Sequence, residues 1–262
     1  MLPRTILRLS SLPAAVTFLL FSLCQNGNTQ STPLSGSYTI GGANPDFGTF
    51  SAAATALHTR GVSATVVFEV EPGVYPEKMA LDSIPGTSSV NTVLFRKKTG
   101  AAGAVWLGGD AGAISFLKTD FVHIESITLA NTLTSGAAAE LSGACTGLVF
   151  AACTFELTGG GGLQGQGQFN DLYVGSCVFI SGDLVVQFQT GECFSTGVLL
   201  EKNHFRNQKN EGIGLYSNFS GAVIRGNEVT TTSQNIYYRA ISSSYCETTK
   251  ILGNHVHHCP GT

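Results

Sequence analysis

Three residues that can bind a metal ion or transfer a proton recur at nearly regular intervals. His204, Glu228 and His255 lie 24 and 27 residues apart, and each directly follows an asparagine. Imidazole nitrogens and a carboxylate can hold a divalent metal, or act as a general base with an orienting carboxylate. The alternative is a solvated turn near a histidine-rich end, because a repeat aligns such residues without any chemistry. No cofactor is required by the sequence, and a divalent metal is the candidate.

A second group of candidates is charged or aromatic. Glu201 and Arg225 are 24 residues apart, and Lys202 follows Glu201. These charges could bind a uronate or sulfated glycan, or they form a surface ion pair worth about 0–1 kcal/mol. Aromatic side chains suit a carbohydrate-binding face and equally suit ordinary β-sheet packing. Tyr216 and Tyr237 are the aromatic ligand-binding candidates, within a wider group that includes Phe219, Tyr238 and Tyr245.

Whether these residues meet depends on the repeat that carries them. Gly197–Phe205 and Gly221–Val229 share the pattern apolar-x-apolar-x-x-Asn-x-apolar. Alternating apolar residues predict a strand with one buried face, and recurrence every 24 to 27 residues predicts a solenoid. The central apolar residues of the repeats are Ile124, Phe150, Val174, Leu200, Ile224 and Ile251.

Weaker apolar segments lie between these anchors, at Leu184–Phe188, Gly212–Leu215 and Ile236–Ile241. Two or three short strands per repeat make one coil of a parallel β-helix, and such coils stack at about 4.8 Å. The sequence therefore predicts an all-β parallel β-helix, a single-stranded solenoid of about eight coils.

One repeat position changes from apolar residues to asparagine along the chain. Stacked asparagines can donate and accept amide hydrogen bonds from coil to coil, so we expect an inward amide ladder. Two neighbouring cysteines at this position are predicted to be buried thiols, with a disulfide as the alternative. The residues of this position are Ile127, Cys153, Cys177, Asn203, Asn227 and Asn254.

One amphipathic helix is predicted at about Phe50–Arg60, ahead of the strands. Phe50, Ala53, Ala54 and Leu57 fall on one face. Thr49 can cap its start and Gly61 suits the position after its end. Because the end of a solenoid needs a cover, we expect this helix to cap the stack.

Gly159–Gly162 and Gly165–Gly167 are predicted to form a glycine-rich loop. No helix is predicted after them, so the pattern does not indicate a phosphate-binding loop.

The N-terminus has the pattern of a secretory signal. Arg4 and Arg8 precede the apolar run Leu12–Leu23, which is too short to span a bilayer, where about 20 residues are needed. We predict a signal peptide at 1–24, a flexible leader at 25–35 and a β-helix domain at 36–262. Lipidation of Cys24 is the alternative to simple cleavage. The chain has seven cysteines but no C-x-x-C pair, so no structural zinc motif is present.

Composition narrows the classes of partner. The formal net charge is −3 and the longest basic run is Arg96–Lys98, so the electrostatic footprint of a nucleic-acid-binding protein is missing. No transmembrane segment is predicted in the mature chain. The chain stops directly after a predicted strand, and we expect a further C-terminal domain or capping element to cover it.

The N-terminal segment resembles known β-helix proteins. Asp46–Ala53 and Val66–Lys78, with its Pro-Gly-x-Tyr-x-Glu turn, are similar to the start of pectin-lyase-like right-handed parallel β-helix proteins. The segment Tyr38–Phe50 is especially similar to secreted, surface-attached proteins of Bacteroidetes-type bacteria. The resemblance covers about Ser35–Thr262 and implies a right-handed helix of coils with an N-terminal capping helix.

The resemblance implies two classes of function. One is a secreted or cell-surface module that binds polysaccharide or serves as an adhesive or structural scaffold. The other is a carbohydrate-active enzyme: a polysaccharide lyase, a pectinesterase-like enzyme or a glycoside hydrolase. The motifs of known pectinesterases, polygalacturonases and pectate lyases are absent from this sequence. Polysaccharide is the expected partner in both cases.

Overall fold

The computed structural model describes residues 32–232, 234–235 and 237–258. The strands and the helix all belong to the unit Pro33–Thr262, one of the two units into which the chain divides. The predicted signal peptide falls on residues outside the described part and stays a prediction. No helix among the described residues is long and apolar enough to cross a bilayer.

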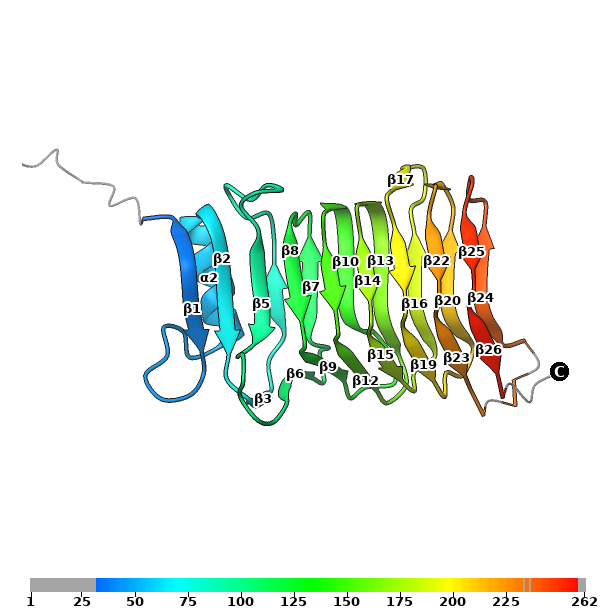
Figure 1. Cartoon of the computed structure of the whole chain (residues 1–262), viewed down its shortest axis with the longest axis horizontal. Coiled ribbons are helices and arrows are strands. Elements are labelled where there is room, and N and C mark those ends of the chain that lie inside the picture. The colour runs from blue at the N-terminus through cyan, green and yellow to red at the C-terminus, as the bar shows by residue number, and fades with distance from the viewer. Residues whose placement is uncertain (1–31, 233, 236, 259–262) are drawn as a thin grey trace, which may run out of the picture. The chain divides into compact units, whose positions relative to one another are not determined.

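Three parallel sheets run along the unit and form a right-handed parallel β-helix (Figure 1). Sheet A has nine strands, which is about one coil more than expected. Its strands are β1 (Leu34–Ile40), β2 (Val62–Val70), β5 (Val93–Lys97), β8 (Val122–Glu125), β11 (Val149–Ala151), β14 (Tyr173–Gly175), β18 (Leu199–Glu201), β22 (Val223–Arg225) and β25 (Lys250–Leu252).

Sheets B and C complete each coil. Sheet B contains β3 (Gly73–Tyr75), β6 (Val105–Gly109), β9 (Thr128–Asn131), β12 (Thr154–Leu157), β15 (Val178–Ile180), β19 (His204–Arg206), β23 (Glu228–Thr230) and β26 (His255–His257). Sheet C contains β4 (Met79–Leu81), β7 (Ile114–Leu117), β10 (Ala137–Thr146), β13 (Gly161–Asn170), β16 (Leu184–Gln189), β20 (Glu211–Tyr216) and β24 (Arg239–Ser244). A short pair joins β17 (Ser195–Thr196) to β21 (Phe219–Ser220).

The predicted register of the repeats is confirmed in sheet A. The central apolar residues are direct ladder partners from coil to coil, from Ile124 through Phe150 to Ile251. The core continues in sheet B as a stack of phenyl rings, with centroids 4.4 Å apart for Phe155 and Phe179 and 4.7 Å apart for Phe179 and Phe205. Each coil therefore buries its apolar side chains against equivalent residues of its neighbours.

The asparagine ladder is also confirmed. Asn203 donates through Nδ2 to Oδ1 of Asn227 at 3.0 Å, and Asn227 donates to Asn254 at 2.9 Å. The same oxygens accept backbone N–H groups, so the buried amides are satisfied on both sides. Cys153 and Cys177 precede them in the stack as buried free thiols, as predicted.

Helix α2 (Phe50–Arg60) begins and ends as predicted. The Thr49 side chain accepts from the Ala52 N–H, and the Gly61 N–H bonds the Leu57 carbonyl at 2.9 Å. Its buried residues are the four predicted ones, Phe50, Ala53, Ala54 and Leu57. The Glu77 carboxylate adds a cap, because it accepts the N–H groups of Phe50 and Ser51.

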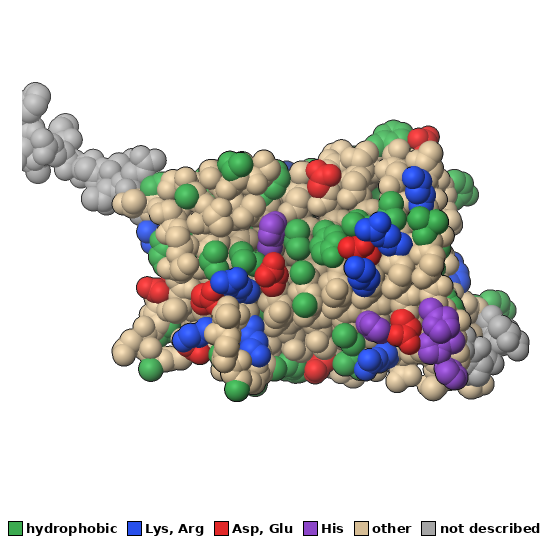
Figure 2. All heavy atoms as spheres, in the orientation of Figure 1, with side chains coloured by type: hydrophobic (Ala, Val, Ile, Leu, Met, Phe, Trp, Pro, Cys, Tyr) green, Lys and Arg blue, Asp and Glu red, His purple; other side chains and the backbone are tan. Residues whose placement is uncertain are grey.

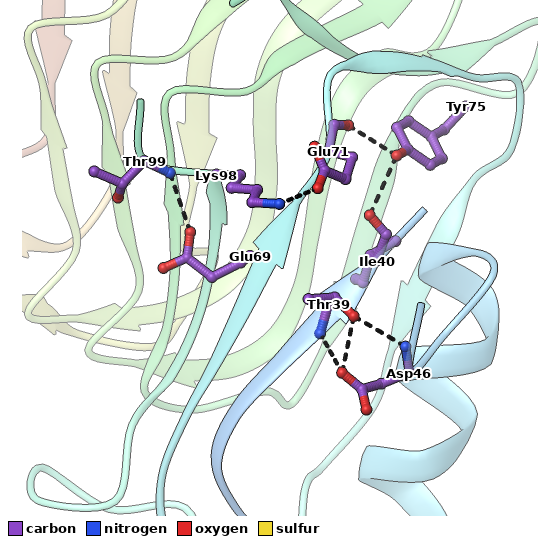
Figure 3. Close-up of polar contacts among 8 residues, drawn as sticks. All are labelled: Thr39, Ile40, Asp46, Glu69, Glu71, Tyr75, Lys98 and Thr99. Carbon is purple, nitrogen blue, oxygen red and sulfur yellow. Dashed lines mark hydrogen bonds and ion pairs between the residues drawn. The ribbon is translucent and has the colours of Figure 1, made fainter. Parts of the chain in front are cut away.

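Polar contacts fix the loop beside this N-terminal end (Figure 3). The Asp46 carboxylate accepts the Thr39 N–H at 2.8 Å, and this bond lowers the pKa of Asp46. The Tyr75 hydroxyl donates to the Glu71 carbonyl at 2.8 Å. The same hydroxyl lies 3.4 Å from the carbonyl of Ile40 at the end of β1, so Tyr75 connects the Pro-Gly-x-Tyr-x-Glu turn to β1.

The opposite end is less covered. Ile251, in the central apolar column, is 49% exposed, whereas Ile224 one coil earlier is 0% exposed. A covering element remains a prediction. At the other end, β1 starts at Leu34, inside the segment predicted to be a flexible leader.

Candidate functional site

The outer face of sheet C presents polar side chains in two rows. Because side chains alternate along a strand and parallel strands are in register, residues of one row lie above one another. The first row is Ser115, Glu140, Gln164, Gln187, Gly214 and Ser242. The second row is Leu117, Ser142, Gln166, Gln189, Tyr216 and Ser244.

A groove of about 390 Å³ lies over the middle of this face. It is lined by Glu140, Leu141, Ser142, Gln164, Gly165, Gln166, Gln187 and Gln189, on β10, β13 and β16. Four side-chain amides therefore line one open groove. An amide has two donors and an acceptor oxygen, and the Gln164 amide already donates to the Leu184 carbonyl at 3.1 Å.

Part of the groove floor comes from the segment predicted as a glycine-rich loop. Gly159 and Gly160 lie outside the strands, but the prediction was wrong from Gly161 on. Gly161–Asn170 forms the continuous strand β13. Gly165 has a packing reason, because a side chain there would collide with the rings of Phe169 and Phe188. Gly165 thus leaves space for two aromatic core residues of the same sheet and does not break the strand.

The charges at this face are paired. The Lys78 ammonium lies 2.7 Å from the Glu140 carboxylate across the first row. Arg239 lies at the far end of the sheet, with Nε 3.3 Å from Glu211. Apart from Glu140, the polar side chains that line the groove are four uncharged amides and the Ser142 hydroxyl.

Tyr216 extends the polar rows as an aromatic platform. Its hydroxyl donates to Glu211 Oε1 at 2.5 Å and lies 2.9 Å from the Ser242 hydroxyl. To reach Glu211 on its own strand, the ring folds back over Gly214, where a side chain would collide with it. The ring is thus held along the sheet surface, and burial together with the Glu211 carboxylate raises the pKa of Tyr216.

Glu211 is the polar anchor of this platform. Its side chain is 0% exposed, and Oε1 also accepts the Ser242 hydroxyl at 2.5 Å. Its second oxygen, Oε2, is buried without a hydrogen-bond partner among the described residues. A buried carboxylate is costly unless it is bonded, so this residue maintains the orientation of Tyr216 at a cost in desolvation.

The charged candidates lie on a different sheet. Glu201 and Arg225 are outward ladder partners in sheet A and form an ion pair of 2.7 Å. Lys202 is in the adjoining turn, and the three residues border a pocket of about 410 Å³ with Gly226, Leu252 and Gly253. The Arg225 hydrogen bond, followed by that from Tyr173, lowers the pKa of Glu201.

Tyr173 repeats the arrangement of Tyr216 on sheet A. Its hydroxyl donates to Glu201 Oε1 at 3.1 Å, and its ring covers Gly175, where a side chain would collide with it. Burial and Glu201 raise the pKa of Tyr173. Sequence reasoning did not single out this residue.

The predicted ligand-binding set is therefore divided between faces of the β-helix. Tyr216 belongs to sheet C, whereas Glu201, Lys202 and Arg225 border the pocket at sheet A. Tyr237 lies before β24 and is 81% exposed. Phe219, from the wider aromatic group, is 0% exposed and points into the core.

The metal candidates come together in part on sheet B. His204 Nδ1 lies 2.7 Å from Glu228 Oε2, and His257 Nε2 lies 2.9 Å from Oε1. His255 is the ladder partner of Glu228, and its ring stacks on His257 at 4.4 Å. Figure 2 shows histidine side chains on both sides of an acidic one near the C-terminal coils. Within the described part of the chain, no three such side chains already converge as metal ligands do.

Sequence reasoning missed most of the sheet C face. The glutamines at 164, 166, 187 and 189 stand at alternate positions in two strands one coil apart, which is the available signal. Glu211 and Arg239 belong to no recognisable sequence motif, because they become neighbours only when consecutive coils stack.

Comparison with known proteins supports the fold alone. No protein-family model matches the sequence, and no curated protein matches it. A solved structure titled as the pectin methylesterase from Aspergillus niger in deglycosylated form aligns with a TM-score of 0.51 and 12% identity. The alignment covers 89% of this chain and 89% of that chain. The chain thus has the right-handed parallel β-helix fold that the resemblance implied.

Proposed function

We propose that this protein is a glycan-binding β-helix module whose ligand lies along the outer face of sheet C. The observation that carries the proposal is the pair of polar rows, which contain four amides, together with Tyr216 in the second row. Neighbouring coils are about 4.8 Å apart, so equivalent side chains repeat along the stack as hydroxyl groups repeat along a glycan.

The side-chain chemistry of the groove favours a neutral glycan. Amides donate to and accept from sugar hydroxyls, whereas a uronate or sulfate needs a cation to replace its lost hydration. Lys78 and Arg239 are already paired with Glu140 and Glu211, and the residues that line the groove include no cation. A neutral polysaccharide therefore matches the groove better than an acidic one does.

The tyrosine supplies the apolar part of recognition. A ring held along a surface can stack against the C–H face of a sugar with little loss of conformational entropy, because its hydroxyl is already bonded. Tyr216 is the ladder partner of Gln189, so the stacking surface adjoins the amide groove.

The proposal includes export to the cell surface or the medium. Arg4, Arg8 and the apolar run Leu12–Leu23 support it. A long, repetitive module at that location can hold a polysaccharide as an adhesive or structural scaffold.

A glycan array followed by calorimetry tests the proposal. We expect binding to a neutral polysaccharide, weaker binding to polygalacturonate, and no released product. The double variant Gln166→Ala/Gln189→Ala should weaken binding by about tenfold, since two hydrogen-bonding side chains are lost. Thr128→Ala/Thr154→Ala, a ladder pair on sheet B, is the matched control and should bind normally. Sustained release of product would instead identify an enzyme of the carbohydrate-active class.

A further inference from the structure

A histidine cluster on the outer face of sheet B has no part in the proposed groove. It consists of His204, Glu228, His255 and His257, on the three consecutive strands β19, β23 and β26. His255 and His257 are two residues apart on one strand, so their side chains leave the same face. Glu228 is opposite His255 and carries His204 on its other side.

Glu228 already contacts two of the three histidines of the cluster, and the ring of His255 stacks on one of these two, His257. The two carboxylate oxygens of Glu228 lie 2.7 Å from a nitrogen of His204 and 2.9 Å from a nitrogen of His257. Ligand atoms around a tetrahedral zinc ion are about 3.3 Å apart, given bonds of 2.0–2.1 Å. To hold a metal ion, Glu228 and the imidazoles that contact it would move slightly apart, and a nitrogen of His255 would turn toward them.

We propose that Glu228, His255 and His257 bind a divalent first-row transition-metal ion such as Zn²⁺, with His204 as a fourth ligand. His255 and His257 leave the same face of β26, and the Glu228 carboxylate stands beside them on the preceding strand β23. Imidazole nitrogens select ions such as Zn²⁺, Ni²⁺ or Cu²⁺ over Ca²⁺ and Mg²⁺, which prefer oxygen ligands.

The bound ion would link strand β26 to strands β23 and β19 of the two preceding coils. β26 carries two of the ligands, and its central residue Val256 is 45% exposed. Because the metal binds the folded arrangement and not the unfolded chain, it adds stability in proportion to the logarithm of its concentration. This end of the stack contains the exposed Ile251, so it benefits most from such a link.

Cobalt titration of the full chain, stripped with EDTA, tests the proposal. The background variant is Cys193→Ser, because Cys193 is an exposed free thiol that could bind the probe. We expect one Co²⁺ per chain, a visible spectrum without thiolate charge transfer, proton release on binding, and displacement by Zn²⁺.

Matched variants locate the ion. His255→Ala/His257→Ala should weaken Co²⁺ binding by about a hundredfold and Glu228→Gln by about tenfold. His123→Ala removes an outward histidine on sheet A and should leave binding unchanged. Circular dichroism of each metal-free variant verifies its fold. Absence of binding to the parent, or equal binding by the folded double variant, overturns the proposal.

Discussion

Two tyrosines in different sheets are each held by a glutamate that accepts the hydroxyl and a glycine that lies under the ring. Tyr216 on sheet C covers Gly214 and bonds Glu211, while Tyr173 on sheet A covers Gly175 and bonds Glu201. In each case an arginine one coil later pairs with the glutamate. The glycine makes room for the ring, and the glutamate holds its hydroxyl.

The surroundings of the two tyrosines differ. The row of Tyr216 continues through Gln189 to other hydrogen-bonding side chains. The row of Tyr173 continues through Val149 on one side and Leu199 on the other. A fixed aromatic ring is therefore a packing solution of this fold, and it suits glycan binding only where polar rows adjoin it.

Removal of the glutamates should give the largest difference in stability. Glu211→Ala removes the buried carboxylate that accepts both the Tyr216 and the Ser242 hydroxyls, and we expect a loss of about 1–3 kcal/mol in the free energy of unfolding. Glu201→Ala removes an ion pair whose Arg225 side chain is 54% exposed, and should cost less than about 1 kcal/mol. Urea denaturation measures both. Equal losses would contradict the difference in burial.

Removal of each tyrosine ring should change the affinity for a glycan by different amounts on sheet C and on sheet A. Tyr216→Ala should weaken binding of a neutral glycan by about tenfold, near 1.4 kcal/mol, because its stacking surface is lost. Tyr173→Ala should leave the dissociation constant within about twofold, since its row lacks amides. Calorimetry with one glycan measures both dissociation constants. A larger loss of affinity in Tyr173→Ala than in Tyr216→Ala would place the binding site on sheet A.

The smallest predicted effect is the change in the free energy of unfolding when acid protonates Glu201 on sheet A. The pKa of Glu201 is lowered in the folded protein, chiefly by Arg225, so its stabilising contribution is present above the pKa of the unfolded chain. That contribution disappears as pH falls through the lowered value. Glu201→Gln should therefore lose less stability than the parent between neutral and acid pH, by under about 1 kcal/mol after screening. Parallel slopes of unfolding free energy against pH in the two proteins would refute this.

The sequence was informative where one residue type repeats at one position. Asn203 and Asn227 identified the ladder, and the alternation around Ile224 determined which residues point inward. Helix α2 followed from its apolar face and from Thr49, because both signals are local.

The sites were harder to predict because their geometry depends on neighbours within and between coils. His257, not His255, contacts Glu228, since the diagonal neighbour on the next strand reaches the carboxylate. Tyr216 was a candidate from its type alone, but Glu211 carried no signal. Its role arises only when the ring folds back over Gly214.

A crystal structure of the protein with a neutral oligosaccharide tests the central claim most directly. We predict a sugar chain along the outer face of sheet C, with hydroxyls within hydrogen-bond distance of Gln166 and Gln189 and one ring stacked on Tyr216. An oligosaccharide bound at Tyr173 on sheet A, with the amide groove empty, would contradict it.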